Sequence, residues 1–227
     1  RPPRSTLSSS SAASDVYKRQ IDGPAASGKG TIARKLAKHF NLGYLDTGIL
    51  YRAVALKMLQ GGINIDDPKC AEKIAREFTV SFIDKKNIRT EAVSVLASKI
   101  AAFPGVRHEL LHYQKSFAKN PGPDKYGAIL DGRDIGTIVC PNADFKIFIT
   151  ADLKIRAKRR WKQLLQSDQT VIYSDILEEL RSRDERDRSR EEAPLVPAAG
   201  SMLIDTSDMT IDVAFDVAKN AILSQNV

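Results

Sequence analysis

Hydrophobic positions along the chain fall into two alternating patterns. Short apolar runs flanked by turn residues are typical of buried parallel strands, and they occur at 127–131, 145–150 and 202–205, with shorter candidates at about 17–22 and 43–45. Between them, apolar residues recur at helical spacing, as in Ile32, Leu36 and Phe40. This spacing predicts helices after residue 30 and over about 48–60, 105–119, 152–166, 172–190 and 210–224. Strands that alternate with helices predict an α/β fold, a parallel five-stranded sheet flanked by helices.

Two segments depart from this alternation. Residues 61–122 begin with Gly61-Gly62 and end with NPGPD, and they predict an insertion of helical pieces with a short extended stretch near 79–83. Residues 1–20 are rich in Ser, Ala and Pro, which predicts a disordered tail. Because few apolar residues precede position 22, we interpret this tail as non-native and the first strand as shortened. Residues 21–227 are expected to form one domain.

Composition restricts the possible partners. The net charge is +7, but only one Trp is present and no aromatic residues interleave the basic stretches, so small anionic ligands are favoured over nucleic acid. No stretch approaches the roughly 18 apolar residues that span a bilayer, so no membrane partner is expected. Cys70 and Cys140 have no metal or redox spacing, which suits a reducing cytoplasm. We expect a cytoplasmic monomer.

The stretch GPAASGKGT (23–31) lies between a predicted strand and a predicted helix and has the pattern G-x-x-x-x-G-K. Backbone N–H groups of such a loop point at a phosphate, and Lys29 adds a mobile positive charge. A plain glycine-rich turn is the alternative. The predicted ATP-binding residues are Gly23, Pro24, Ala25, Ala26, Ser27, Gly28, Lys29, Gly30 and Thr31. Gly30 occupies the position where most such loops have Ser or Thr, and the hydroxyl follows at Thr31, as is typical of nucleoside monophosphate kinases.

A second motif, HELLH (108–112), matches the zinc pattern H-E-x-x-H. The extended form of that motif needs Gly at position 115 and a third His at position 118, where this chain has Lys115 and Ala118. We therefore predict no metal-ligating residues here and interpret His108 and His112 as surface residues of a helix.

Six stretches in order resemble the bacterial cytidylate (CMP) kinases. They are IDGPAASGKGT (21–31), YLDTGILYRA (44–53), ASKIAAFPGVR (97–107), DGRDIGT (131–137), RDERDRSR (183–190) and APLVPA (193–198). The resemblance implies a P-loop NTPase fold of the nucleoside monophosphate kinase type. It also implies transfer of the γ-phosphoryl group of ATP to CMP or dCMP. A related kinase acting on UMP, AMP or another acceptor is the alternative. The stretch 79–92 is shorter here than in many bacterial members.

Several charged residues then gain an expected role. The resemblance places Thr47, Arg52, Ser98, Arg107, Arg133, Asp134, Arg183, Asp187 and Arg190 on the CMP side. Cytosine differs from uracil by a donor amine, so Asp134 is expected to accept from that amine while Arg107 donates to the ring nitrogen and carbonyl. The alternative for each of these charges is a solvated helix face or a strand-end turn.

The remaining predicted catalytic residues lie on the helix over 152–166. Arg156 and Arg160, spaced i, i+4, are expected to begin a lid over ATP that extends to about residue 172. With Lys29 and Arg133 they form the predicted catalytic set. Mg²⁺ is expected to bridge the ATP oxygens, with Asp131 and Thr31 as indirect contacts through water.

Overall fold

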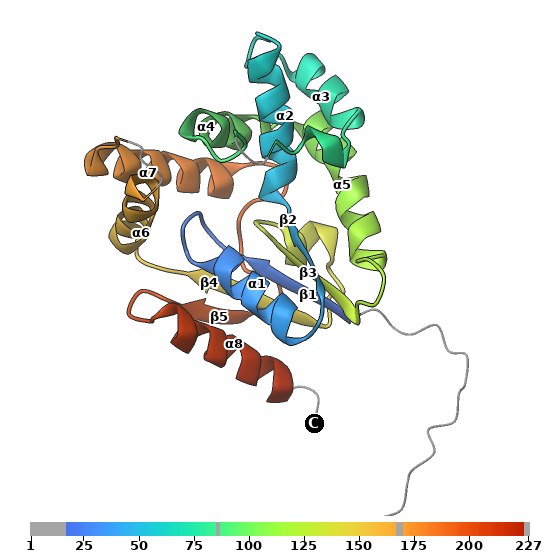
Figure 1. Cartoon of the computed structure of the whole chain (residues 1–227), viewed down its shortest axis with the longest axis vertical. Helices are drawn as coiled ribbons and strands as arrows, with labels where there is room; N and C mark the ends of the chain where they lie inside the picture. Colours follow the sequence, from blue (N-terminus) through green and yellow to red (C-terminus); the bar gives the residue numbers. More distant parts are fainter. Residues whose placement is uncertain (1–16, 85–86, 167–169, 225–227) are drawn as a thin grey trace, which may run out of the picture.

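The computed structural model describes residues 17–84, 87–166 and 170–224. Its centre is a parallel five-stranded sheet in the order β2-β3-β1-β4-β5 (Figure 1). The strands are β1 (Tyr17–Asp22), β2 (Gly43–Asp46), β3 (Gly127–Gly132), β4 (Phe145–Thr150) and β5 (Met202–Asp205). β1 pairs with β3 and β4 on its two sides, so Ile21 lies opposite both Asp131 and Ile147. The predicted parallel five-stranded sheet is confirmed.

Helices cover the sheet on both faces (Figure 1). On one face, α1 (Lys29–His39) packs beside α8 (Ile211–Ser224), and their apolar sides bury Leu36 and Ile222 with Ile21 of β1. On the other face, α5 (Pro104–Lys119) and the π-helix η2 (Ile135–Val139) contact β3. α6 (Leu153–Leu165) and α7 (Tyr173–Ser189) pack against each other. The end of the predicted lid falls partly at 167–169, outside the described residues.

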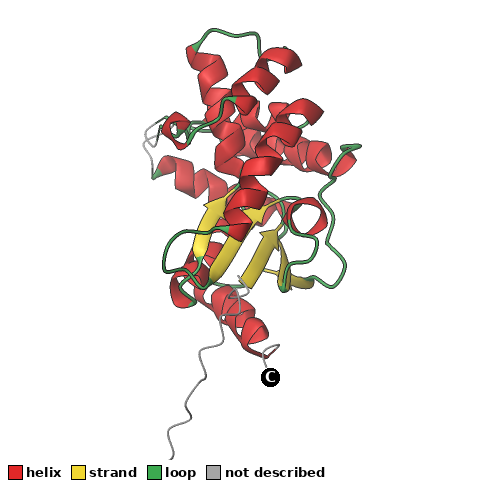
Figure 2. Ribbon diagram, turned by 90° about the vertical axis from the view of Figure 1, so that its right-hand side faces the viewer, coloured by secondary structure: helices red, strands yellow, loops and turns green. Residues whose placement is uncertain are grey.

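The segment from 61 to 122 is helical, and Figure 2 shows its helices gathered beyond one end of the sheet. It contains α3 (Pro68–Arg76), α4 (Glu91–Ile100) and α5, and it packs on α2 (Gly48–Gln60) through one shared apolar core. The extended stretch predicted near 79–83 is wrong, because Val80–Phe82 form a 3₁₀ helix, η1. A lone extended stretch would leave its backbone groups unpaired, whereas here Phe82 N–H donates to the Thr79 carbonyl.

The predicted tail is also wrong in its boundary. Residues 17–20 belong to β1, the central strand, and residues 1–16 lie outside the described part of the chain. Backbone pairing with β3 and β4 needs no particular side chain, so a polar segment can occupy this place. The strand has its full six residues. Among the described helices, none combines the length and the apolar character that crossing a bilayer requires.

Candidate active site

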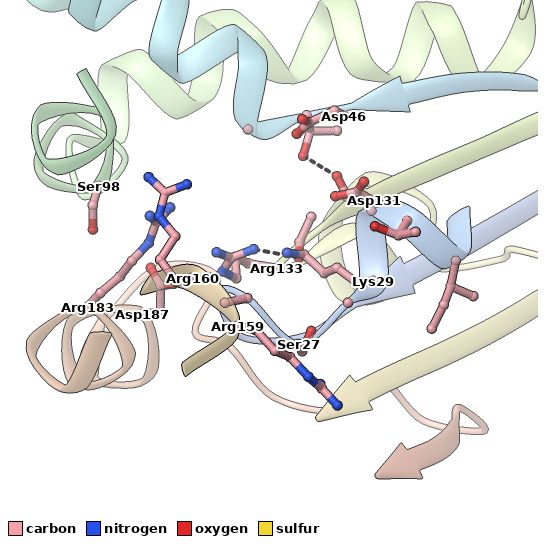
Figure 3. Close-up of a pocket in the computed structure, with 18 of the residues that line it drawn as sticks. Ser27, Lys29, Asp46, Ser98, Asp131, Arg133, Arg159, Arg160, Arg183 and Asp187 are labelled. Carbon is pink, nitrogen blue, oxygen red and sulfur yellow. Dashed lines mark hydrogen bonds and ion pairs between the residues drawn. The ribbon is translucent and has the colours of Figure 1, made fainter. Parts of the chain in front are cut away.

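A cavity of about 570 Å³ lies at the carboxyl ends of the strands, where open α/β sheets bind their ligands. One wall is the phosphate loop with the start of α1, and the opposite wall comes from α2, α4 and α5. α6 and α7 close a third side, and Figure 3 shows Arg159 and Arg160 with Arg183 and Asp187 on that side of the cavity. Donor and acceptor could therefore be held by different parts of the chain within one cavity.

The phosphate loop runs from the end of β1 into α1. Gly23 has φ +148°, and a Cβ at this position would overlap the carbonyl oxygen of Ile149 in β4, so only glycine fits. Gly28 caps α1, and Lys29 is the first residue of that helix. Burial and the neighbouring Arg133 lower the pKa of Lys29, against the opposing effect of Asp131, to about 7 in all. Lys29 is thus poised to gain a proton when phosphate anions arrive.

The glycine after this lysine has a steric reason. A Cβ at Gly30 would lie 3.0 Å from Oδ2 of Asp131 and 3.5 Å from the hydroxyl of Tyr44. That hydroxyl donates to the same Asp131 oxygen at 2.5 Å. A serine or threonine at position 30 would therefore press on a carboxylate at the end of β3. The hydroxyl that other loops carry at this place is found one residue later, at Thr31.

Oxygen donors suited to Mg²⁺ gather beside Lys29. Asp46 at the end of β2 and Asp131 at the end of β3 line the same cavity as Thr31 (Figure 3). Burial raises the pKa of Asp131 and the Asp46 charge raises it further, while Lys29 opposes both. Two neighbouring carboxylates with a hydroxyl nearby fit a hard divalent cation. Sequence reasoning had assigned Asp131 and Thr31 to this role but missed Asp46.

Arginines dominate the rest of the cavity wall. Those that line it are Arg34, Arg52, Arg89, Arg107, Arg133, Arg159, Arg160, Arg183 and Arg190. Burial and the neighbouring charge of Arg133 together lower the pKa of Arg183 to about 10. Asp187 lies among them and accepts from Arg133 Nε at 2.8 Å. Two adjacent buried guanidiniums are favourable only beside anions, so this wall is suited to phosphate groups.

The deepest part of the acceptor side holds a charged pair. Arg107 from α5 donates to Oδ2 of Asp134, and both side chains are about nine-tenths buried. The second arm of Arg107 donates to the carbonyl oxygen of Ala101 at 3.3 Å. Ser98 of α4 lines the same region and accepts from Arg186 at 3.3 Å. A carboxylate acceptor beside a fixed guanidinium donor can distinguish ring edges by their hydrogen-bonding pattern.

A buried carboxylate, that of Asp22, fixes the backbone segment that follows Asp134. Asp22, at the end of β1, accepts from the backbone N–H groups of Ile135 and Gly136 at 2.9 and 2.8 Å. These are the first residues of η2, directly after Asp134. Burial raises the pKa of Asp22 to about 7, in spite of the two amide donors, which lower it. Asp22 therefore ties the strand that precedes the phosphate loop to the segment that presents Asp134.

Most of the predicted site residues meet at this one cavity. From the phosphate loop these are Ala26 to Thr31, and from the acceptor side Thr47, Arg52, Ser98, Arg107, Arg133, Asp134, Arg183, Asp187 and Arg190, with Arg160 from α6. Gly23 and Pro24 are buried beneath the loop and do not line the cavity, and Ala25 lines only a smaller adjoining cavity. Their contribution is to the shape of the loop.

The placement expected for Arg156 is not what the structure shows. Its side chain is 4% exposed, and it forms a bidentate ion pair with Asp184 of α7 at 2.6 and 3.2 Å. It also donates to the carbonyl oxygens of Ala25 and Ala151 at 3.2 and 2.9 Å. All these partners are protein groups, so Arg156 joins the phosphate loop to α6 and α7, and it does not line the cavity.

Arg159 is the residue that sequence reasoning missed on this helix. Its guanidinium lines the cavity and donates to the hydroxyl and carbonyl oxygens of Thr206, at 3.0 and 2.5 Å. Arg89 was missed too, and it lies 3.6 Å from Asp46. Arg159 and Arg160 both border the cavity, whereas Arg156 faces α7, and no signal in the sequence separates these neighbouring arginines. His108 and His112 are exposed on α5, as expected of surface residues.

A glycine-rich phosphate loop at the centre of a parallel sheet, facing a wall of arginines across one cavity, defines a P-loop kinase of the nucleoside monophosphate type. A family model described as cytidylate kinase matches residues 20–223. The chain belongs to the cytidylate kinase family, whose reaction class is ATP-dependent phosphotransfer.

Individual relatives agree with this assignment. The chain is 47% identical over 205 residues to a cytidylate kinase of Paramagnetospirillum magneticum, which covers 90% of this chain and 97% of the relative. It is 46% identical to a cytidylate kinase of Caulobacter vibrioides, covering 89% of this chain and 93% of the relative. A crystal structure of an uncharacterized protein from Eubacterium ventriosum matches with a TM-score of 0.51 and 15% identity, covering 92% of this chain and 99% of that one. This last likeness concerns the fold alone.

Proposed function

We propose that the protein transfers the γ-phosphoryl group of ATP to CMP or dCMP, giving ADP and CDP or dCDP. The observation that carries the proposal is the division of one cavity into two halves. The phosphate loop with Lys29 lies at one end, and the Arg107–Asp134 pair lies at the other, with buried arginines between them. The phosphate loop would bind the donor phosphates, the arginines would surround the transferred group and the acceptor phosphate, and the Arg107–Asp134 pair would bind the acceptor base.

The acceptor base is read by the charged pair. Asp134 accepts a hydrogen bond from the exocyclic amine of cytosine, and Arg107 donates to the ring nitrogen and carbonyl oxygen. Uracil would place a carbonyl against the Asp134 carboxylate and an N–H against Arg107, so both contacts become repulsive. Mismatches that leave buried polar groups unpaired cost on the order of 10²- to 10⁴-fold in specificity.

The transfer itself needs positioning and charge. A phosphate oxygen of CMP attacks the γ-phosphorus, and the bond from that phosphorus to the β–γ bridging oxygen breaks, so that ADP carries away the electron pair. The acceptor phosphate is already an anion, so no general base is required. Arg52, Arg133 and Arg183 orient the acceptor phosphate, and Lys29 holds the donor phosphates.

Arg160 supplies positive charge close to the transferred group, since it lines the cavity beside Arg133 and Arg183. Asp46, Asp131 and Thr31 would hold Mg²⁺, directly or through its water molecules. When bound, that ion neutralises negative charge on the donor phosphates. We further propose that the protein acts as a monomer in the cytoplasm on small-molecule nucleotides.

The proposal is tested by coupled ADP release with ATP, Mg²⁺ and one acceptor at a time, CMP, dCMP, UMP or AMP. We expect turnover with CMP and dCMP, and at least a 100-fold lower kcat/KM with UMP. Asp134→Asn should lower kcat/KM for CMP about 100-fold or more. If the asparagine turns its amide oxygen to the cytosine amine, its NH₂ group faces Arg107, which is also a hydrogen-bond donor. Asp66→Asn, an exposed carboxylate in the 61–122 segment, is the matched control. If UMP or AMP is turned over faster than CMP, the acceptor assigned to the enzyme would be that nucleotide and not CMP.

A further inference from the structure

An ion pair joins the helix that carries Arg160 to the opposite wall of the cavity. Arg160 of α6 donates through Nη2 to Oε2 of Glu91 at 2.7 Å. Glu91 is the first residue of α4, the helix that also carries Ser98. Figure 3 shows Arg160 on the side of the cavity that faces this helix. Both side chains are mostly buried, 17% and 30% exposed, so water screens their attraction only in part.

A second carboxylate lies against the first. Glu179 of α7 lines the same small cavity as Glu91. Burial raises the pKa of Glu179, and the neighbouring Glu91 carboxylate raises it further, to about 7 in all. Burial alone would raise the pKa of Glu91, but the Glu179 carboxyl beside it and the charge of Arg160 outweigh burial and lower the pKa. Below about pH 7 Glu179 therefore holds a proton, and the negative charge of the two carboxyl groups rests on Glu91.

The surroundings of this pair are strongly positive. A smaller cavity of about 140 Å³ adjoins the main one at this point. Besides Glu91 and Glu179, its charged lining residues are Lys29 of α1, Arg52 of α2, Arg89 before α4, Arg133 after β3, Arg160 of α6 and Arg183 of α7. All six of these cations also line the main cavity, and Arg160 is the one that forms an ion pair with Glu91.

A carboxylate that binds one edge of a guanidinium fixes the position and orientation of the group, so its N–H donors already point toward the cavity before the substrates bind. Without that anchor, Arg160 would be one of several mutually repelling cations on a long, flexible side chain. A misplacement of about 1 Å in such a group is enough to lower a rate roughly 100-fold.

We propose that Glu91 is a positioning residue that holds Arg160 at the transferred phosphoryl group, and that Glu179 keeps the carboxyl pair at a single negative charge. The inference rests on the proposed kinase function. It makes α4, which belongs to the acceptor side, responsible for the orientation of an arginine that acts on the donor's γ-phosphoryl group.

The test is a double-mutant cycle on kcat in the full-length protein, with Glu91→Gln, Arg160→Ala and the double variant. Glu91→Gln should lower kcat about tenfold and leave KM for CMP within about twofold, because the base and acceptor-phosphate contacts remain. The double variant should be no slower than Arg160→Ala alone, since Glu91 acts through Arg160. Glu178→Gln is the matched control, because Glu178 is the neighbour of Glu179 on α7 but forms an exposed pair with Arg181.

The pH profile provides a readout that a merely structural role would not move. Loss of the Glu179 proton places a second negative charge beside Arg160 and draws it away from the phosphoryl group. We therefore expect kcat of the wild type to fall as the pH rises through about 7, and Glu179→Gln to remove this fall. A thermal midpoint within a few degrees of wild type would show that each variant is folded, and Glu91→Asp, which keeps the charge, should recover part of the lost rate.

The outcomes are distinct. If the wild type converts CMP but the losses of the single variants multiply in the double variant, or Glu91→Gln matches the wild type, the positioning role is wrong and the kinase assignment stands. An unchanged pH profile in Glu179→Gln would overturn the part assigned to Glu179. A wild type that converts none of the four acceptors would overturn the proposed function and this inference with it.

Discussion

Gln20 is a polar residue in an apolar place. It lies in the central strand β1 and is 1% exposed, and neither its amide nitrogen nor its amide oxygen has a hydrogen-bond partner among the described residues. Its side chain packs against Gly136 of η2, where even one added carbon would overlap it. A buried amide without partners costs about 1–3 kcal/mol relative to an apolar group of similar shape.

Gln20→Met should therefore stabilise the protein by about 1–3 kcal/mol, because methionine keeps the length of the side chain and removes the unpaired amide. The free energy of unfolding in urea would measure the gain. Gln114→Met is the control, since Gln114 is equally buried but donates to the Leu110 carbonyl at 3.3 Å and should lose stability when replaced. A loss of stability in Gln20→Met would mean that the amide has a partner in solution.

Lys29 should couple ATP binding to pH. Burial and Arg133 lower its pKa to about 7, whereas the phosphates of ATP would favour the charged form. At pH 8 the empty site holds Lys29 mostly neutral, so binding should take up close to one proton. The apparent affinity for ATP should fall by up to tenfold per pH unit above pH 8.

Calorimetry in two buffers of different ionisation enthalpy measures this uptake directly. In Lys29→Met the proton uptake should disappear, even if some binding remains through the backbone of the loop. Equal binding enthalpies in the two buffers for the wild type would mean that Lys29 is already charged before ATP arrives.

At the scale of elements, Arg156 holds three parts of the molecule together. It joins α6 to Asp184 of α7 and to the carbonyl of Ala25 in the phosphate loop, all within the interior. Removing one partner of a buried ion pair leaves the other charge unpaired, which costs about 3–5 kcal/mol.

Arg156→Ala should accordingly lower the free energy of unfolding by about 3–5 kcal/mol, measured by chemical denaturation. The exposed pair between Arg181 and Glu178 on α7 offers the contrast, and Arg181→Ala should change stability by less than about 1 kcal/mol. If Arg156→Ala folds with wild-type stability but loses activity, the arginine would serve ATP after all.

Helix α6 shows which features could be predicted from the sequence and which could not. Apolar runs and helical spacing located the five strands and the helices α1, α2, α5, α6, α7 and α8 to within one or two residues, because burial imposes both patterns on the chain. α3 and α4 were expected only as helical pieces without bounds, and η2 was not predicted. The motifs also identified most residues of the cavity. Which arginine of α6 faces the nucleotide depends on how that helix is rotated against α7, and this is a tertiary contact. An i, i+4 spacing places Arg156 and Arg160 on one side of a helix without telling which neighbour that side meets.

Asp46 and η1 were missed for the same reason. The carboxylate of Asp46 gains its role only because β2 lies beside β3 in the sheet, which brings it to Asp131. In 79–83, β-branched and aromatic residues favoured an extended stretch, but the sheet has no neighbouring edge there and the backbone satisfies itself in a 3₁₀ turn. Both outcomes depend on strand order and packing, which a single sequence does not contain.

At the scale of the whole molecule, positive charge is concentrated on one cavity. Nine arginines line it. Burial lowers the pKa of Arg52, Arg183 and Arg190, and neighbouring arginines lower it further. An empty protein therefore bears a repulsion that a multivalent anion would relieve.

We expect sodium sulfate to raise the thermal midpoint of the empty protein more than sodium chloride does at equal ionic strength. Sulfate also stabilises proteins by exclusion from their surface, so the comparison needs Arg183→Gln, in which the additional effect should shrink. An equal sulfate effect in Arg183→Gln and the wild type would assign it to exclusion alone and not to the cavity. Thermal melts monitored by fluorescence are sufficient.

The contact between Gly30 and Asp131 has a consequence for anyone who exchanges parts between enzymes. The loop after β1 and the end of β3 are about a hundred positions apart, yet a side chain at the former would meet the carboxylate of the latter. A phosphate loop taken from a protein that carries Ser or Thr at this place would have to displace the Asp131 carboxylate by a few tenths of an ångström. Anyone who exchanges this loop should therefore treat Asp131 and Tyr44, at the ends of two other strands, as part of the same unit.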